Sequence, residues 1–322
     1  MRALRVSALS DDLSGVSLDE VPEPQRRPGQ LLVRVRAASL NYPDLLMTRG
    51  AYQLKPDLPF TLGMEMAGEV VEADADGAFR PGDRVAAGTR LGAFADLVAV
   101  DAAAARPIPP GTDDATAAAL GAAYLTAYVA LVRLGRLQAD EWVLVHGATG
   151  GVGLAAVDLA QALGGRVIAT SRSPAKLEVI ASEHQPHATM PAAGFRDAVK
   201  KLTGGGADLV FDPVGGDVFD ESTRCIDFGG RLLVVGFTSG RIATVPTNVP
   251  LIKGFSVIGV RAGEYGRRFP ERGAENLDAI CSLAAEGRIR PRVHAAYELA
   301  DWRAAFDAMA RSEHVGKLVL TP

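Results

Sequence analysis

Hydrophobic and polar positions follow one pattern in the first third of the chain and another after it. From Gln30, "QLLVRVRAASL" alternates apolar and polar side chains, which is the period of a half-buried strand. "AGEVVEA" from Ala67 and "DRVAAG" from Asp83 are short runs bounded by Gly, Pro and Asp. Residues 1–110 therefore predict a compact, mostly antiparallel β domain.

The pattern changes after "RPIPPGT" at 106–112, a loop with three prolines. Residues 113–137 predict a helix, and apolar runs then alternate with helical patterns. The expected strands are "WVLVHGA", "RVIATS", "ADLVFDPV", "RLLVVGF" and "FSVIGV", and the expected helices between them include 152–163, 173–182 and 218–226. Alternating strands and helices indicate parallel strands joined by crossovers, and continuous apolar strands indicate a sheet covered on both faces. The predicted class is α/β, with a doubly wound Rossmann sheet.

The last 50 or so residues are too few to form a stable domain alone. They contain helices near 275–286 and 301–309 and a closing strand, "GKLVL". We expect them to rejoin the first domain. The predicted domains are a discontinuous, mostly β catalytic domain of residues 1–119 and 264–322, and a dinucleotide-binding domain of residues 120–263.

Composition and charge narrow the class of protein. The chain has 322 residues and a net charge of −4, without the basic face that nucleic-acid binding requires. Two cysteines, Cys225 and Cys281, exclude a disulfide framework. The N-terminus lacks the apolar core of a signal peptide, and we expect no stretch near the roughly 20 apolar residues of a membrane span. These features favour a soluble cytoplasmic protein.

A glycine-rich stretch, "VLVHGATGGVG" at 143–153, lies between a buried strand and a helix. It reads Ala148-Thr149-Gly150-Gly151-Val152-Gly153, which fits the A-x-G-x-x-G pattern of a dinucleotide-binding turn. Gly150 would let the backbone approach a pyrophosphate, and Gly153 would let the helix pack on the strand. The helix N-terminus attracts phosphate. A glycine-rich turn without a ligand is the alternative.

The end of the second strand distinguishes NADPH from NADH. An NAD site usually has Asp or Glu there for the ribose hydroxyls. This chain has Ser171, Arg172 and Lys176, and no carboxylate between Asp158 and Glu178. Charged side chains pair well with a 2′-phosphate. These residues therefore predict NADPH, unless Arg172 and Lys176 are only a solvated helix start.

The chain resembles the zinc-independent quinone oxidoreductases of the medium-chain dehydrogenase/reductase superfamily. The motifs that carry the resemblance are "NYPDLLMTRGAY", "LPFTLGMEMAGEV", "GDRV", "AYLTAYVAL", "HGATGGVG", "SRSPAKLE", "FDPVGG" and "GGRLLVVGF". The resemblance implies a GroES-like catalytic domain, a Rossmann domain and an active site in the cleft between them. It also implies a homodimer, in which the strand near 255–260 pairs with its copy.

The resemblance further assigns site residues. It implies that Tyr52 lies near the nicotinamide, and that Asn41 touches the ribose or the acceptor where zinc-dependent relatives carry a ligand. Tyr42 is an alternative hydrogen-bond donor, and both tyrosines have a simple packing role as their alternative. The remaining expected cofactor contacts are Thr126, Gly215, Gly236, Phe237, Val260 and Lys317; Lys317 would reach the phosphates or cap the cleft, or lie on the surface.

Zinc ligands are missing from the matching motifs. Zinc-dependent relatives carry Cys before the Asp of the first motif and His before the Glu of the second, where this chain has Asn41 or Tyr42 and Met64. Neither cysteine lies in the first 224 residues, and a catalytic zinc needs about three protein ligands. We therefore predict no metal.

Without zinc, acceptors that spread the charge of an added hydride are favoured. The first hypothesis is an NADPH-dependent quinone reductase. The second is an NADPH-dependent reductase of conjugated C=C bonds in enones, enals or enoyl thioesters, for which Arg261, Arg267 and Arg268 would contact thioester phosphates. The third is a non-catalytic NADPH-binding protein.

Overall fold

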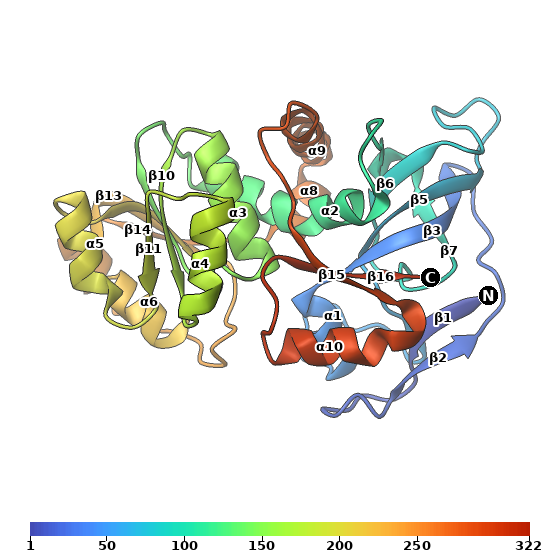
Figure 1. The fold of residues 1–322 in the computed structure, drawn as a ribbon, viewed down its shortest axis with the longest axis horizontal. Helices are drawn as coiled ribbons and strands as arrows, with labels where there is room; N and C mark the ends of the chain where they lie inside the picture. Colours follow the sequence, from blue (N-terminus) through green and yellow to red (C-terminus); the bar gives the residue numbers. More distant parts are fainter. The chain divides into compact units, whose positions relative to one another are not determined.

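The computed structural model describes residues 1–322, which form two compact units (Figure 1). The terminal unit consists of residues 1–122 and 291–322, and the central unit consists of residues 123–290. The first boundary between the two units falls inside helix α2 (Asp114–Tyr128). A π-helical segment, Val129–Leu134, continues this helix. Residues near both ends of the chain therefore belong to the same unit.

The central unit is built on a six-stranded parallel sheet with the order β11-β10-β9-β12-β13-β14. Its strands are β9 (Trp142–Val145), β10 (Arg166–Ser171), β11 (Ala188–Pro191), β12 (Ala207–Asp212), β13 (Ile226–Val234) and β14 (Ser256–Gly259). The chain winds outward from β9 in one direction and then from β12 in the other. The strand order therefore reverses between β9 and β12, and such a switch point is where open α/β sheets bind ligands.

Helices cover both faces of this sheet (Figure 1). Phe195 of α5 (Phe195–Thr203) and Phe219 of α6 (Gly216–Ser222) pack with Leu144 and Ile168 of the strands. Helices α3 (Gly151–Ala162) and α4 (Pro174–Glu183) contact β9, β10 and β11. The central residues of β9 and β10, Val143–Val145 and Val167–Ala169, are fully buried, which explains their continuous apolar runs.

Helices α7 (Asn248–Lys253), α8 (Ala262–Arg268) and α9 (Pro270–Ala285) also belong to the central unit. Arg133 donates from Nε to Asn276 Oδ1 and from Nη2 to Glu275 Oε2, both at 2.7 Å, which ties α9 to the end of the α2 segment. The second boundary between the two units lies at 290/291. The domain boundary predicted from the sequence lies at 263/264.

One predicted helix lies at different bounds. The sequence places a helix over 218–226, but α6 ends at Ser222 and Ile226 begins β13. Ile226 pairs with Ala207 of β12, so this residue is in the sheet. An apolar stretch beside a short helix does not itself reveal where pairing begins.

The terminal unit contains two sheets and a helical layer. A three-stranded sheet has the order β2 (Val16–Glu20), β1 (Arg2–Val6), β4 (Phe60–Thr61). A seven-stranded sheet has the order β15 (Val293–Glu298), β16 (Lys317–Thr321), β3 (Gln30–Leu40), β5 (Glu65–Glu72), β6 (Arg84–Gly88), β8 (Ala105–Pro107), with β7 (Leu97–Asp101) also on β3. Its pairs are antiparallel except β15 with β16. Helices α1 (Tyr42–Thr48) and α10 (Trp302–Ala310) and the 3-10 turns Ala102–Ala104 and Leu299–Asp301 complete it.

The C-terminal segment is integral to the core of the terminal unit. Phe306 of α10 meets Phe94 edge to face, with ring centroids 6.3 Å apart, and also meets Trp302. β16 pairs with β3 through Leu318, Val319 and Leu320. β15, α10 and β16 therefore belong to the terminal unit, whereas α8 and α9 belong to the central unit.

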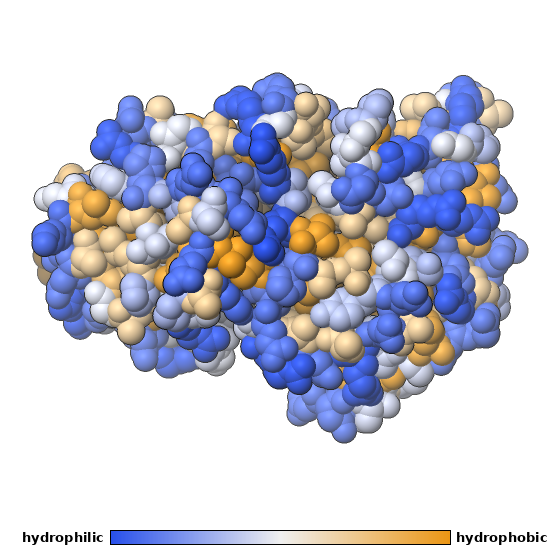
Figure 2. Space-filling view, viewed as in Figure 1, coloured by the Kyte–Doolittle hydropathy of each residue, from blue (hydrophilic) through white to orange (hydrophobic).

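One expectation from the sequence is wrong: a long apolar stretch is present. The helical segment Asp114–Leu134 is long and apolar enough to cross a membrane by length and composition, with a mean hydropathy of 1.7. Leucine, valine and alanine side chains together produce this value, and half of the window is buried, as in core helices of folded domains. Hydrophilic residues predominate on the face of the molecule drawn in Figure 2.

Candidate active site

The glycine-rich turn joins β9 to α3 in the central unit. Gly147 has a φ of +56°, and a Cβ on Gly153 would lie 2.2 Å from the Gly147 carbonyl oxygen, so the close packing requires glycine. A Cβ on Gly150 would meet nothing nearer than 3.5 Å. No side chain caps α3 at its N-cap, Gly150. The turn thus has an open backbone surface and an uncapped helix N-terminus, which fit a pyrophosphate.

The turn contacts the end of β10, as a cofactor site requires. The peptide N–H of Ala148 donates to Thr170 O at 3.0 Å. The hydroxyls of Thr149 and Ser171 lie 3.4 Å apart. The structure therefore brings Ala148, Thr149 and Ser171 together, whereas their partners on a cofactor stay a prediction.

Arg172 and Lys176 follow β10. Arg172 is exposed, and its guanidinium forms no hydrogen bond or ion pair within the chain. Lys176 is half-buried, and its peptide N–H donates to the hydroxyl of Ser173, the N-cap of α4. Arg172 is thus a cation without a partner beside the hydroxyl of Ser171, the kind of group that a phosphate would pair with.

The turn after β12 approaches the same sheet edge. Asp212 Oδ1 accepts from the peptide N–H of Val214 at 2.8 Å and of Gly215 at 2.9 Å, which makes Asp212 a turn-forming carboxylate. Burial raises the pKa of this carboxyl. A Cβ on Gly147 would lie 3.3 Å from the side chains of Pro213 and Val214. The turns after β9 and β12 therefore meet at the switch point.

The remaining residues that the sequence predicts to contact the cofactor follow β13 and β14, at the same edge of the sheet. The peptide N–H of Gly236 donates to Asp212 O, at 3.4 Å. The Phe237 side chain is 42% exposed, and its ring lies 3.0 Å from the Cβ position of Gly215. The peptide N–H of Val260 donates to Val234 O. Gly215, Gly236, Phe237 and Val260 thus follow the carboxyl ends of their strands.

The terminal unit contains a buried polar cluster around Lys317. Its ammonium donates to Leu40 O at 3.1 Å, to Asn41 Oδ1 at 2.7 Å and to Glu65 Oε1 at 3.1 Å. Asn41 Nδ2 donates to Glu65 Oε1 at 2.8 Å. Lys317 and Glu65 are 6% and 2% exposed. All three ammonium donors are used, so the predicted contact with phosphates would require Lys317 to leave this cluster.

The same cluster fixes the orientation of Asn41. Because an ammonium can only donate, the amide oxygen of Asn41 faces Lys317 and its nitrogen faces Glu65. Asp44 accepts from the peptide N–H groups of Asn41 and Gly63. Burial raises the pKa of Asp44 to about 7. The predicted contact of Asn41 with ribose or acceptor stays a prediction.

The two candidate tyrosines differ in environment. Tyr42 is the first residue of α1 and is 39% exposed, whereas the adjacent Asn41 is buried. Tyr52 is half-buried and packs against the core of the terminal unit. Thr126 is half-buried in α2. The proposed roles of these residues toward a ligand stay predictions.

Sequence reasoning missed His146, which lies directly beneath the glycine turn. Its ring nitrogens lie 2.8 Å from the hydroxyls of Thr170 and Ser222. Complete burial lowers the pKa of His146 to about 3. A neutral ring thus ties the end of β9 to β10 and α6. A polar residue at the end of a buried strand was the available signal.

Metal ligands do not converge in this fold. The structure has no group of three or more His, Cys, Asp or Glu side chains that could hold a metal ion. The two histidines with close spacing have separate contacts: His184 lies 3.9 Å from Asp158, and His187 stacks edge-on against Trp142. The side chain of His184 is 8% exposed, although His184 lies in the turn that ends α4.

Two family models match the chain. A zinc-binding dehydrogenase model matches residues 151–279, and an alcohol dehydrogenase GroES-like domain matches residues 27–110. Quinone oxidoreductase-like protein 2 of Mus musculus is 34% identical, over 99% of this chain and 93% of its own. The chain belongs to the zinc-independent quinone oxidoreductase family.

Two further relatives extend the comparison of this quinone oxidoreductase family member. The quinone oxidoreductase of Thermus thermophilus, solved also in complex with NADPH, is 31% identical over both full chains, with a TM-score of 0.88. Erythronolide synthase EryA2 of Saccharopolyspora erythraea is 35% identical over 96% of this chain but only 8% of its own length. The predicted family, Rossmann sheet and GroES-like domain are thereby confirmed, and the chain is an oxidoreductase.

Proposed function

We propose that this chain is an NADPH-dependent, zinc-independent oxidoreductase that transfers hydride to a quinone. The observation that carries the proposal is the open turn at Gly150, with an unpartnered Arg172 at the end of the neighbouring strand. One feature fits a pyrophosphate and the other fits a 2′-phosphate. The NADPH complex of the Thermus thermophilus relative supports the same cofactor.

The chain's own residues divide the work of holding this cofactor. The peptide N–H groups of Gly151 and Val152 would bind the pyrophosphate, together with Thr149. Ser171, Arg172 and Lys176 would hold the 2′-phosphate. Gly215, Gly236, Phe237 and Val260 would lie toward the nicotinamide, with Thr126 from α2. When bound, NADPH supplies a hydride.

A quinone is favoured because two polar side chains predicted for the site, Asn41 and Lys317, already have partners. Asn41 and Lys317 use their polar atoms on each other and on Glu65. A quinone spreads the incoming charge over several atoms, so a few hydrogen bonds are enough. Tyr52 or Tyr42 would donate one of them. The names of the quinone oxidoreductase relatives agree with this acceptor.

Reduction of a conjugated C=C bond is the second candidate. The match to a part of erythronolide synthase EryA2 is the comparison that supports it. Arg261 is exposed directly after Val260 and would contact a thioester phosphate. Arg267 and Arg268 are less suitable, because both donate to Glu264. Only Arg261 of the three predicted rim arginines is therefore without a carboxylate partner at hydrogen-bond distance.

A screen of NADPH oxidation tests these candidates together. Purified protein is mixed with NADPH and a quinone, an enal or an enoyl-CoA ester, and absorbance at the nicotinamide band is followed. Turnover with quinones alone supports the proposal. Turnover with enoyl thioesters alone would establish the second candidate, and tight NADPH binding without any turnover would indicate a non-catalytic binding protein.

We also propose that two copies of the chain associate through β14, in the cytoplasm. β14 is an edge strand, so its outer backbone groups have no partner in the sheet. Large apolar side chains near this edge are exposed: Phe228 (84%), Leu251 (81%), Ile252 (76%) and Val257 (39%). An exposed edge with apolar neighbours fits a symmetric homodimer.

A further inference from the structure

The β13–α7 loop, residues 235–247, lies on the turn that follows β12. The peptide N–H of Thr238 donates to Pro213 O at 3.1 Å, and that of Ser239 donates to Val214 O at 3.0 Å. The Thr238 hydroxyl also donates to Pro213 O, at 3.1 Å. These bonds hold the first half of the loop at the sheet edge that follows the carboxyl ends of β12 and β13.

The loop and the turn approach each other so closely that side chains would not fit between them. Gly215 and Gly216 have φ values of +69° and +59°. A Cβ on Gly215 would lie 3.0 Å from the ring of Phe237, and a Cβ on Gly216 would lie 2.7 Å from the hydroxyl oxygen of Ser239. A small displacement of the loop would therefore move the Phe237 ring.

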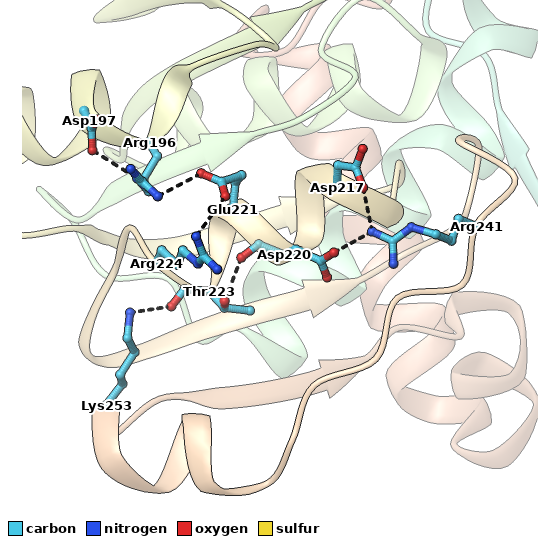
Figure 3. A network of polar contacts seen from close by, with 9 residues as sticks. All are labelled: Arg196, Asp197, Asp217, Asp220, Glu221, Thr223, Arg224, Arg241 and Lys253. Atoms are coloured by element: carbon cyan, nitrogen blue, oxygen red, sulfur yellow. Dashed lines mark hydrogen bonds and ion pairs between the residues drawn. The ribbon is translucent and has the colours of Figure 1, made fainter.

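A single side chain connects the far part of this loop to α6. Arg241 Nη2 donates to Asp217 Oδ1 at 2.9 Å and to Asp220 Oδ2 at 2.5 Å (Figure 3). The bond to Asp220 is the main cause of a raised pKa of Arg241. Asp217 is fully exposed and Asp220 is 43% exposed, so each pair alone is screened by solvent. Two carboxylates on one guanidinium nevertheless fix its direction.

The loop carries apolar side chains on both sides of this attachment. Phe237 is 42% exposed and Ile242 is 69% exposed. Exposed apolar residues are unfavourable on a mobile loop, but they suit contact with the flat apolar ring of an acceptor. Arg241 lies between Phe237 and Ile242 in the sequence. No other side chain of this loop forms an ion pair.

We propose that Arg241 is a positioning residue for the acceptor: by tying the β13–α7 loop to α6, it holds Phe237 and Ile242 where they contact the acceptor beside the nicotinamide. Arg241 touches neither cofactor nor acceptor in this role. The inference rests on the proposed function, because it requires the nicotinamide to lie at the switch point. NADPH affinity would depend instead on the turn at 147–153 and on Arg172.

The test compares Arg241→Gln with Arg224→Gln. Arg224 is a matched control, because it is also an exposed arginine paired with a carboxylate of α6, Glu221, but does not reach the loop (Figure 3). Three quantities are measured: NADPH affinity by fluorescence titration, kcat and KM for the quinone, and hydrogen exchange of the peptide that covers residues 236–245. Arg241→Lys, which keeps the charge, is the conservative variant.

In Arg241→Gln, we expect kcat/KM for the quinone to fall roughly tenfold, since small misplacements of contact groups have effects of this size or larger. NADPH affinity should stay within about twofold. Exchange over 236–245 should accelerate, Arg224→Gln should behave as wild type, and Arg241→Lys should recover most of the activity.

Unchanged exchange and unchanged acceptor kinetics in Arg241→Gln would overturn the inference while leaving the proposed function intact. A fall in NADPH affinity that accounts for the whole loss of activity would also overturn it. If the wild type turns over no acceptor, the proposed function fails, and the exchange comparison alone decides whether Arg241 holds the loop.

Discussion

At the scale of single residues, His146 shows how burial changes an ordinary titrating group. Its pKa is lowered to about 3, so the folded central unit keeps the ring neutral where the unfolded chain, with a pKa near 6.5, would bind a proton. The stabilisation is therefore complete above about pH 6.5 and is lost as the pH falls toward 3.

The lowered pKa of His146 predicts that the stability of the central unit depends on pH, and that this contribution comes from one side chain. The free energy of unfolding of the central unit should fall by up to ~1.4 kcal/mol per pH unit between about pH 6.5 and 3 because of His146. In His146→Asn that part of the slope should disappear. Urea unfolding, followed by tryptophan fluorescence at several pH values, measures this slope. A Trp302→Phe background leaves only Trp142, which lies in the central unit. Equal slopes for the two proteins would contradict the prediction.

Arg172 predicts the choice of cofactor. Loss of a charge-assisted bond to phosphate costs ~1.5–3 kcal/mol, so Arg172→Ala should raise KM for NADPH by roughly 10- to 100-fold and leave KM for NADH almost unchanged. Arg166→Ala is the control, because Arg166 lies at the opposite end of the same strand. An equal rise of both KM values would show that Arg172 does not bind the 2′-phosphate.

At the scale of secondary-structure elements, the Lys317–Glu65 pair joins β16 to β5, which are not neighbours in the sheet. Lys317→Met would leave the Glu65 carboxylate buried without its cation, and the terminal unit should lose ~3–5 kcal/mol of stability. The double variant Lys317→Met with Glu65→Gln should recover part of this loss. Urea unfolding in a Trp142→Phe background, which leaves Trp302 as the only tryptophan, measures the stability of the single and the double variant. Lys201→Met is the control. If the stability losses of Lys317→Met and Glu65→Gln simply add in the double variant, the two side chains are not coupled.

The elements also show what could be predicted from the sequence. The strands at 30–40 and 166–171 have the predicted bounds, because alternation and apolar runs are local signals. The structure places α9 in a different unit from the expected one, because Arg133 reaches Asn276 across 143 positions and no periodicity reveals that bond. The switch-point glycines followed from their strand–helix context.

The buried polar contacts were not predictable in the same way. Lys317 and Asn41 are 276 positions apart, and only the folded sheet brings them together. A glutamate at the start of β5, directly before an apolar stretch, was a signal that some cation must accompany it, since a buried charge needs a partner. The sequence did not identify which cation. Arg241 likewise gave no local sign of its two carboxylate partners.

At the scale of the whole molecule, the exposed edge strand predicts association. Leu251→Asp combined with Ile252→Asp places two charges beside β14, and we expect the dimer to dissociate, with its mass halved in light scattering after size-exclusion chromatography. Leu202→Asp is the control, since Leu202 is 42% exposed on a different helix, α5. A monomeric wild type would disprove the proposed dimer.

The pairing of β16 with β3 also has a consequence for biosynthesis. β3 leaves the ribosome long before its neighbour in the sheet, β16, has been translated. The central unit, complete at Arg290, has all of its own residues before the terminal unit does. β3 must therefore wait, with one strand edge uncovered, until β16 emerges, and it is at this stage that the nascent chain is most in need of chaperone protection.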